Sequence, residues 1–257
     1  MRRGMLLLAG GVLLLTAAVA QADFTAYNDL VWNSAYAPTP NANATLYTIG
    51  EGSPGPSTGL LKDITTGAST GVTATLTQNA SVRYQPDNTG GGTECNAGTD
   101  ATNIFGTPAN VGVQGVVYYS DTVGWYVDLA FTGLNPSKTY EFVTTANRNG
   151  GSGYNDRTTK FTLSDADAFA NLSSAGVTIG DAGASATFCT GNNTAAGYIA
   201  RWTGIQAGAD GDFSVRAQAA SSQNKAYAFS VFKLVETPEP TTLWLLGLGA
   251  LALRRRG

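Results

Sequence analysis

The sequence contains no histidine among its 257 residues. This absence excludes Ser-His-Asp and Cys-His catalysis, zinc sites with histidine ligands, and any mechanism that uses an imidazole base. Charged residues are also scarce, at 13% of the chain, which leaves hydroxyls, carboxylates and a few lysines and arginines for chemistry. We therefore expect a non-enzymatic protein with no catalytic residues, no metal site and no cofactor.

The chain also lacks a hydrophobic run of comfortable membrane-spanning length, and its two apolar stretches lie at its ends. At the N-terminus two arginines precede an apolar run from Met5 to Leu15, and the motif Ala20-Gln21-Ala22 follows. This order predicts a signal peptide over residues 1–22, with a helical apolar part, that is removed before Asp23. Ala18-Val19-Ala20 is an alternative cleavage motif.

The C-terminal stretch contains, in order, Pro238, Glu239, Pro240, an apolar run, Arg254, Arg255 and Arg256. The apolar run from Thr241 to Leu253 predicts a helix of about 20 Å, which is shorter than the roughly 30 Å hydrocarbon core of a bilayer. The prolines keep this helix from starting earlier, and the arginines would hold its end at the cytoplasmic face. A plain tail anchor is the alternative interpretation.

The tail over residues 237–257 resembles the PEP-CTERM sorting signal of exported bacterial proteins. In that family an exosortase, which is a membrane cysteine transpeptidase, recognises the tail, and the proteins are associated with exopolysaccharide and biofilm production. The resemblance implies transient anchoring in the inner membrane and processing near Pro238, Glu239 and Pro240. It also implies that the mature protein is located in the cell envelope or outside the cell. It implies nothing about the biochemistry of the body.

The body is acidic once both ends are set aside. Residues 23–240 contain ten basic and eighteen acidic residues, which gives a net charge of −8. The basic residues are scattered singly, so the body is a poor partner for nucleic acid or anionic lipid. We therefore expect no nucleic-acid partner.

Two cysteines, Cys95 and Cys189, are the only ones in the chain. In an exported protein two cysteines most simply form one disulfide bond. A bridge that closes a loop of nearly a hundred residues would stabilise the fold by about 4–5 kcal/mol on the chain-entropy model. The sequence predicts this bridge, but spacing alone leaves open whether the two residues meet.

The body over residues 23–236 is expected to form one domain of many short strands. No stretch longer than about ten residues shows the apolar period of a helix, whereas short runs of Val, Thr, Tyr and Phe are bounded by Gly, Asn and Pro. The sequence therefore predicts an all-β fold, a single antiparallel β-sandwich. In outline it resembles jelly-roll or galactose-binding modules, a resemblance of fold that carries no function.

The predicted strands are 46–49, 72–77, 81–84, 116–120, 124–131, 140–147, 157–163, 177–179, 186–190, 198–205, 213–217 and 226–235. Within 124–131 the residues alternate, which predicts Trp125, Val127, Leu129 and Phe131 on one face and Tyr126, Asp128 and Ala130 on the other. Residues 226–235 predict one long central strand. Residues 164–174 predict one or two helical turns. Leu134, Pro136 and Tyr140 are typical of the tyrosine corner of sandwich domains.

One group of residues suggests a sugar-binding surface. Tyr154, Asp156 and Arg157 lie together at a loop-to-strand junction, and Trp202 could join them from another strand. An aromatic platform with planar polar groups suits the apolar faces and paired hydroxyls of sugars. The alternative is that Asp156 and Arg157 form a local ion pair while Trp202 lies in the core.

Two other constellations are weaker. The pairs Asp165/Asp167 and Asp210/Asp212 could supply oxygen ligands to calcium, but turn and cap roles suit them better than an incomplete ligand set. A glycosidase needs two acids across a cleft, yet Glu141 lies on a strand and Glu236 at the domain end. We therefore favour a non-enzymatic envelope or matrix protein that binds polysaccharide. The alternatives are a carbohydrate-active hydrolase or lyase that uses Asp and Glu, and a surface adhesin.

Overall fold

The structure is a computed structural model of the chain, and it describes residues 23–30, 39–46, 57–79, 83–85, 93–119, 123–148, 152–220, 222 and 224–237. The predicted signal helix and the predicted C-terminal helix both lie outside these residues. Among the residues described, no helix has the length and apolar character that a membrane crossing requires.

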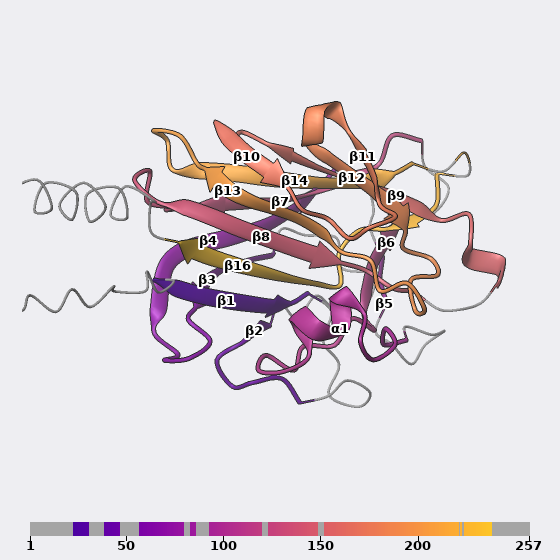
Figure 1. Cartoon of the computed structure of the whole chain (residues 1–257), viewed down its shortest axis with the longest axis horizontal. Helices are drawn as coiled ribbons and strands as arrows, with labels where there is room; N and C mark the ends of the chain where they lie inside the picture. The colour runs from indigo at the N-terminus through magenta and orange to yellow at the C-terminus, as the bar shows by residue number, and fades with distance from the viewer. Residues whose placement is uncertain are drawn as a thin grey trace, which may run out of the picture.

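The described residues form two large sheets and one small sheet (Figure 1). Sheet A contains, in spatial order, β10 (Ala168–Asn171), β13 (Ala200–Gln206), β8 (Thr139–Thr145), β16 (Val231–Thr237), β1 (Phe24–Asp29) and β2 (Thr45–Leu46). Sheet B contains β11 (Thr178–Gly180), β12 (Ser185–Cys189), β9 (Thr158–Ser164), β14 (Asp212–Ala219), β7 (Tyr126–Thr132), β4 (Ser69–Gln78) and β3 (Ser57–Lys62). Sheet C contains β15 (Ala226–Tyr227), β6 (Val116–Tyr119) and β5 (Arg83–Gln85). One α-helix, α1 (Asp100–Phe105), and two 3₁₀ turns, η1 (Ser152–Tyr154) and η2 (Asp181–Gly183), complete the described elements.

Sheets A and B pack face to face around an aromatic core. The ring of Phe131 on β7 lies 5.5 Å from that of Phe142 on β8, 5.0 Å from Phe213 and 5.3 Å from Phe232. These contacts join the two sheets, since Phe131 and Phe213 belong to sheet B and the other two to sheet A. The predicted all-β class and the pairing of two largely antiparallel sheets are therefore confirmed. The parallel pair of β1 with β2 is the exception to the antiparallel pattern.

The predicted alternation along residues 124–131 is also confirmed. Its four apolar members are buried in the core between the sheets, whereas Tyr126, Asp128 and Ala130 are half-buried on the outer face of sheet B. The corner motif forms as well: the amide of Asn135 donates to the hydroxyl of Tyr140 at 2.7 Å, and Leu134 is buried beside it.

A second apolar layer covers part of the outer face of sheet A. Tyr27, Val143 and Val231 point outward from β1, β8 and β16, and they pack with Phe105 of α1 and with Val111. The helix begins at its N-cap Thr99, whose side chain accepts a hydrogen bond from the amide of Thr102. At six residues α1 is too short for a periodic apolar signal, so the sequence did not predict it.

Two predicted elements differ in the structure. Residues 164–174 hold the edge strand β10 in place of helical turns, because residues 168–171 pair with β13 of sheet A. Residues 226–235 form two strands rather than one. Ala226–Tyr227 pair with β6 in sheet C, and the chain then crosses to the centre of sheet A as β16. β16 is a central strand as predicted, between β8 and β1.

The predicted disulfide bond is not formed, and both cysteines are free thiols. Cys95 is buried in the apolar layer outside sheet A, where its thiol donates to the carbonyl of Asn193 at 3.5 Å. Cys189 ends β12 of sheet B, and its thiol donates to the carbonyl of Asn155 at 3.3 Å. The two residues therefore belong to different layers of the molecule, which their separation in sequence could not indicate.

Candidate functional site

The outer face of sheet B holds a polar groove of about 510 Å³. Its residues come chiefly from β7, β9 and β14, which are neighbours in the sheet and each present alternate residues outward. The lining residues are Asp128, Lys160, Thr162, Ser164, Asp165, Ser214, Arg216 and Gln218. We call this surface the sheet B groove. Every lining side chain offers a hydrogen-bond donor or acceptor, so the groove suits a polar ligand.

Arg216 is held from two sides within the groove. Its Nε and Nη2 atoms donate to the two carboxylate oxygens of Asp128 at 2.7 and 2.8 Å, in a bidentate pair between facing residues of β14 and β7. Its guanidinium carbon lies 3.6 Å from the centre of the Tyr126 ring. The hydrogen bonds with Asp128 raise the pKa of Arg216. The guanidinium is thus charged and oriented before any ligand arrives.

The ends of the groove are fixed by two further polar contacts. Lys160 of β9 pairs with Asp181 of η2 at 2.7 Å, and this contact lowers the pKa of the Asp181 carboxyl. The hydroxyl of Ser214 donates to Asp165 at 2.9 Å. The groove therefore combines cations, carboxylates, hydroxyls and an amide, and its two cations, its two carboxylates and the Ser214 hydroxyl are held by neighbours. Groups that are held in place before binding lower the entropy cost of binding a polar ligand.

The sequence alone indicates some of the residues that lie at this groove but not how their strands come together. Tyr126 and Asp128 were predicted on the polar face of their strand, and the alternation in β9 and β14 would have indicated which of their residues face the same way. What the sequence lacked was the strand order, which puts β14 between β7 and β9. The carboxylate that holds Arg216 is 88 residues away in the chain.

Three of the predicted sugar-binding residues lie in the loop around η1. The Tyr154 ring lies near two guanidinium groups, with the Cζ atom of Arg157 at 4.2 Å and that of Arg148 at 5.4 Å from the ring centre. Arg157 also donates to the hydroxyl of Tyr227. Asp156 is exposed, and within the described part of the chain it forms no ion pair with Arg157. The local pair that we considered is therefore replaced by cation–π contacts.

Trp202 does not join these residues. It is fully buried on the inner face of β13, where its ring stacks on Phe142 at 6.3 Å and its Nε1 donates to the carbonyl of Gly183 at 2.9 Å. Trp202 therefore lies in the core, as the alternative interpretation of this residue predicts. Arg201 beside it points outward and pairs with Glu141 at 2.6 Å.

The two aspartate pairs lie near one another at the end of the groove. Burial, followed by the charges of Asp210 and Asp165, raises the pKa of Asp212. A side chain at Gly208 would meet both Asp167 and Asp210. Even so, no group of three or more metal-ligating side chains occurs among the residues that the structure describes. These aspartates lie close together because they belong to two neighbouring turns, where aspartate is a common residue.

The three glutamates in the described part of the body, Glu94, Glu141 and Glu236, each accept hydrogen bonds from neighbouring groups. Glu141 accepts from Arg201 at 2.6 Å and from Lys233 at 3.1 Å on the outer face of sheet A. Burial opposes ionisation of Glu141, but the two cations outweigh it and lower its pKa. Glu236 accepts from Tyr140 at 2.8 Å at the end of β16. Glu94 accepts from the amide of Val113 at 3.3 Å beside a small cavity of about 200 Å³ under α1.

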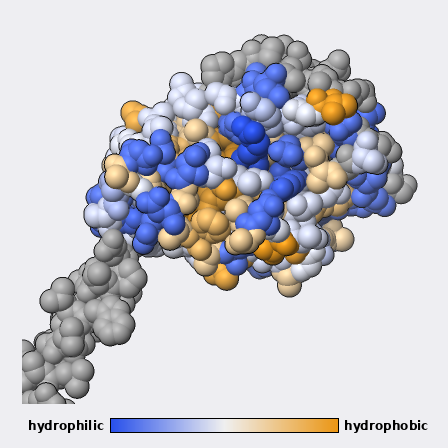
Figure 2. Space-filling model, turned by 90° about the horizontal axis from the view of Figure 1, so that it is seen from above, coloured by the Kyte–Doolittle hydropathy of each residue, from blue (hydrophilic) through white to orange (hydrophobic). Residues whose placement is uncertain are grey.

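The face of the molecule that is seen from above Figure 1 is largely hydrophilic. Figure 2, which views the molecule from above Figure 1, shows hydrophilic residues over much of this face with hydrophobic residues in patches between them. The large exposed apolar side chains among the described residues are Leu46, Leu60, Val123, Leu172 and Ile179. Single exposed apolar residues of this kind are common on protein surfaces.

Comparison with known proteins gives information on the tail alone. The family model described as the PEP-CTERM protein-sorting motif matches residues 236–256. This match confirms the predicted sorting signal, whose residues Pro238 to Arg256 lie outside the described part of the chain. The motif indicates an exported protein that an exosortase processes at the cell envelope. No curated protein and no solved structure matched the chain.

Proposed function

We propose that this chain, which ends in a PEP-CTERM sorting motif, is a non-enzymatic protein of the cell envelope or extracellular matrix that binds polysaccharide in the sheet B groove. The observation that carries the proposal is the fixed guanidinium of Arg216, held by Asp128 and Tyr126 in the middle of a wholly polar groove. The exosortase-type transpeptidase is its processing partner, and the tail is its transient membrane anchor.

The chemistry of the groove supports a polysaccharide ligand over an apolar one. Sugars present paired hydroxyls, which planar groups such as guanidinium, amide and carboxylate bind two at a time. Arg216 and Gln218 follow one another on the outer face of β14, and Ser214 precedes them. A row of this kind along a strand suits a chain molecule.

A binding assay with matched arginine variants tests the proposal. All described strands and all three buried apolar clusters of the described residues lie between Asp23 and Thr237, so residues 23–237 contain the described core. We expect this segment to be retained on a matrix polysaccharide, and Arg216→Ala to weaken retention at least about tenfold, as loss of a charge-assisted bidentate contact would. Arg201→Ala, on the outer face of sheet A, is the control and should bind normally.

Two results would contradict this function. The segment could fail to be retained on every polysaccharide of the producing organism's matrix, or Arg216→Ala could bind as well as the unchanged protein while both remain folded. In either case the body would have a structural role without a glycan ligand. Oligomers whose abundance rises with protein concentration would instead favour the adhesin hypothesis.

One observation favours the hydrolase or lyase alternative, because the carboxylates of Asp128 and Asp165 line the same groove. Both already have partners, since Asp128 pairs with Arg216 and Asp165 accepts from Ser214. An enzyme would release reducing or unsaturated ends from the bound polymer, and Asp128→Asn with Asp165→Asn would abolish that release. We expect no release from the unchanged protein.

Mass spectrometry of the envelope form tests the sorting part separately. We expect a C-terminus close to Pro238, Glu239 and Pro240 and an N-terminus at Asp23. A mature protein that still carries Arg254, Arg255 and Arg256 would show that the tail acts as an ordinary anchor.

A further inference from the structure

The two ends of the body meet at one corner of the sandwich. β1 begins and β16 ends at the same side of the molecule (Figure 1). The two strands are antiparallel neighbours in which Phe24 faces Glu236, and the backbone nitrogen of Asp23 donates to the carbonyl of Glu236 at 3.1 Å. The predicted signal-peptide cut before Asp23 and the start of the sorting motif therefore lie at one place.

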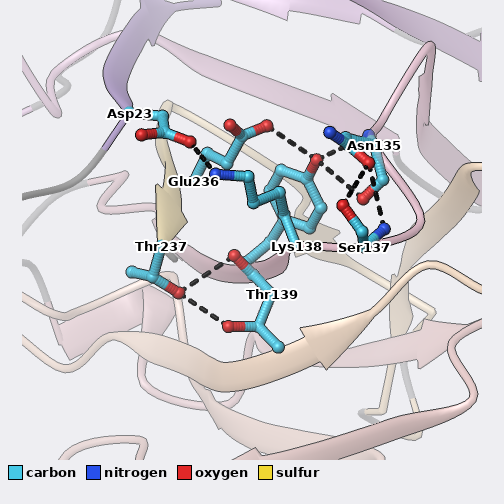
Figure 3. A network of polar contacts seen from close by, with 8 residues as sticks. Asp23, Asn135, Ser137, Lys138, Thr139, Glu236 and Thr237 are labelled. Carbon is cyan, nitrogen blue, oxygen red and sulfur yellow. Dashed lines mark hydrogen bonds and ion pairs between the residues drawn. The ribbon is translucent and has the colours of Figure 1, made fainter. Parts of the chain in front are cut away.

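This corner holds a polar cluster from four elements (Figure 3). Lys138, from the turn before β8, pairs with the carboxylate of Asp23. The hydroxyl of Tyr140 donates to Glu236 at 2.8 Å and accepts from the amide of Asn135 at 2.7 Å. One residue further, the hydroxyls of Thr139 and Thr237 lie 2.8 Å apart. These contacts fix the last two residues of β16.

The charges of the cluster do not balance. It contains two carboxyl groups, those of Asp23 and Glu236, but one cation, Lys138. Lys138 lowers the pKa of Asp23. The pKa of Glu236 is raised, first by burial and then by the Asp23 carboxyl. Asp63, directly after β3, is a further acidic group near this corner, and its carboxylate accepts from the amide of Thr25 at 3.0 Å.

We propose that signal-peptide removal supplies the missing cation, because the α-ammonium freed at Asp23 forms at the cluster and locks the end of β16 next to the sorting motif. The atom that becomes the ammonium is the same nitrogen that already lies 3.1 Å from the Glu236 carbonyl. In the precursor it is a neutral amide. After cleavage it carries a charge at neutral pH, since an α-amino group has an ordinary pKa of about 7.7–8.0. Maturation at one end thus stabilises the other end.

The sign of the pH dependence follows from the charges. Acidic neighbours raise the pKa of the folded-state amine, so its stabilising effect is complete below about pH 8 and is lost as the pH rises through the raised value. The effect also needs the Glu236 carboxylate, and it weakens in acid as that group takes up a proton. The stabilisation should therefore be greatest below about pH 8 and above the raised pKa of Glu236.

Acetylation of the N-terminus gives a matched test. The chain from Asp23 to Gly257 is prepared in detergent with either a free or an acetylated N-terminus, because the acetyl amide keeps the N–H donor and removes only the charge. We expect the free form to unfold about 1–3 °C higher at pH 6.5, with the difference disappearing above about pH 10. The pKa of the amine, measured from the pH dependence of its acylation rate, should exceed the ordinary value.

Two substitutions separate the cluster from a general charge effect. Glu236→Gln removes one carboxylate and should shrink the difference between the free and acetylated forms. Lys138→Met removes the competing cation and should enlarge it. Equal unfolding temperatures of the two forms at pH 6.5 would overturn the proposal, and so would an amine pKa at or below the ordinary value. Polysaccharide binding plays no part in this measurement.

Discussion

The two outer faces of the sandwich use the same strand period for opposite purposes. On sheet A the outward residues Tyr27, Val143 and Val231 are apolar, and α1 with its flanking loops covers them in a second core. On sheet B the outward residues include Asp128 and Arg216, which line an open polar groove. The comparison indicates that the outer face of sheet A contributes to the stability of the fold. The outer face of sheet B stays open to solvent.

The ion clusters of the two faces differ in the same way. Glu141 on sheet A is shielded between two cations, and its side chain is 15% exposed. Arg216 on sheet B is 41% exposed and has one carboxylate partner. A shielded carboxylate that loses its charge leaves two cations unpaired, whereas an exposed pair is screened by water. Stability should therefore respond to changes on sheet A and binding to changes on sheet B.

The largest expected difference between the sheet A side and the sheet B side of the molecule is in the rates at which their two cysteines react with a thiol reagent. Burial, followed by the charge of Glu94, raises the pKa of the Cys95 thiol to about 12, so at pH 8 only about one molecule in ten thousand carries the reactive thiolate. Cys189 lies on sheet B and is only partly buried. We expect a thiol reagent to label Cys189 at least about a hundredfold faster than Cys95, with both labelled in denaturant. A disulfide in the exported protein would contradict the arrangement.

Removal of the helix side chain that covers sheet A should have the largest effect on stability. Phe105 is 1% exposed, and its ring lies 6.3 Å from that of Tyr27. We expect Phe105→Ala to lower the free energy of unfolding by about 3–5 kcal/mol, because a buried aromatic ring leaves a cavity. Thr77→Ala, on the outer face of sheet B, should change it by no more than about 0.5 kcal/mol. Urea titrations compare the two, and similar losses would mean that the faces are not different.

Neutralising one carboxylate on each face should give a smaller difference in the free energy of unfolding. We expect Glu141→Gln to cost about 1–3 kcal/mol and Asp128→Asn about 0.2–1 kcal/mol. The pKa of Glu141 is lowered in the folded state, so its contribution is present above the unfolded value of about 4.3 and is lost as the pH falls through the folded value. The stabilities of Glu141→Gln and the unchanged protein should therefore converge as the pH falls from about 4.3 through the lower folded-state pKa. Parallel curves down to pH 3 would contradict this assignment.

The smallest expected effect on stability is beside the groove, where the negative charges of Asp210 and Asp165 act on Asp212. Because the pKa of Asp212 is raised, its ionisation opposes folding above that pKa and stops doing so as the pH falls below it. Asp212→Asn should raise the unfolding temperature at pH 7 by no more than about 2 °C, with no gain at pH 3. Ser214→Ala, which keeps all the charges, should show no such pH-dependent gain. A lower unfolding temperature for Asp212→Asn at pH 7 would indicate that the carboxylate has a favourable partner.

The sequence predicted the strands well wherever the apolar pattern was local. Residues 124–131 alternate and contain most of β7 (Tyr126–Thr132), and Tyr140 caps its corner as its motif indicated. The prediction was wrong at residues 164–174, where pairing with β13 overrides a weak helical pattern. It was also wrong for residues 226–235, whose continuous apolar run gives no sign that the chain changes sheets after Tyr227.

The candidate site was predicted less well than the fold. Tyr154 and Arg157 do lie together, but Arg157 contacts Tyr227, which is 70 residues away, and Trp202 faces the core. A tryptophan on a strand can point to either face, and alternation settles the face only when its neighbours are clearly polar or apolar. Arg201 and Thr203 flank Trp202 and favour an inward ring, which is the alternative interpretation given above for this residue.

The sequence by itself determined the sorting motif, the all-β class and the absence of imidazole chemistry, because each depends on composition or on short-range order. Only the tertiary structure decided that Cys95 and Cys189 stay apart, that Arg216 meets Asp128, and that Asp23 meets Glu236. The physical reason is that strand neighbours are chosen by packing over the whole domain. Contacts between residues far apart in the chain follow from that choice and leave no local trace in the sequence.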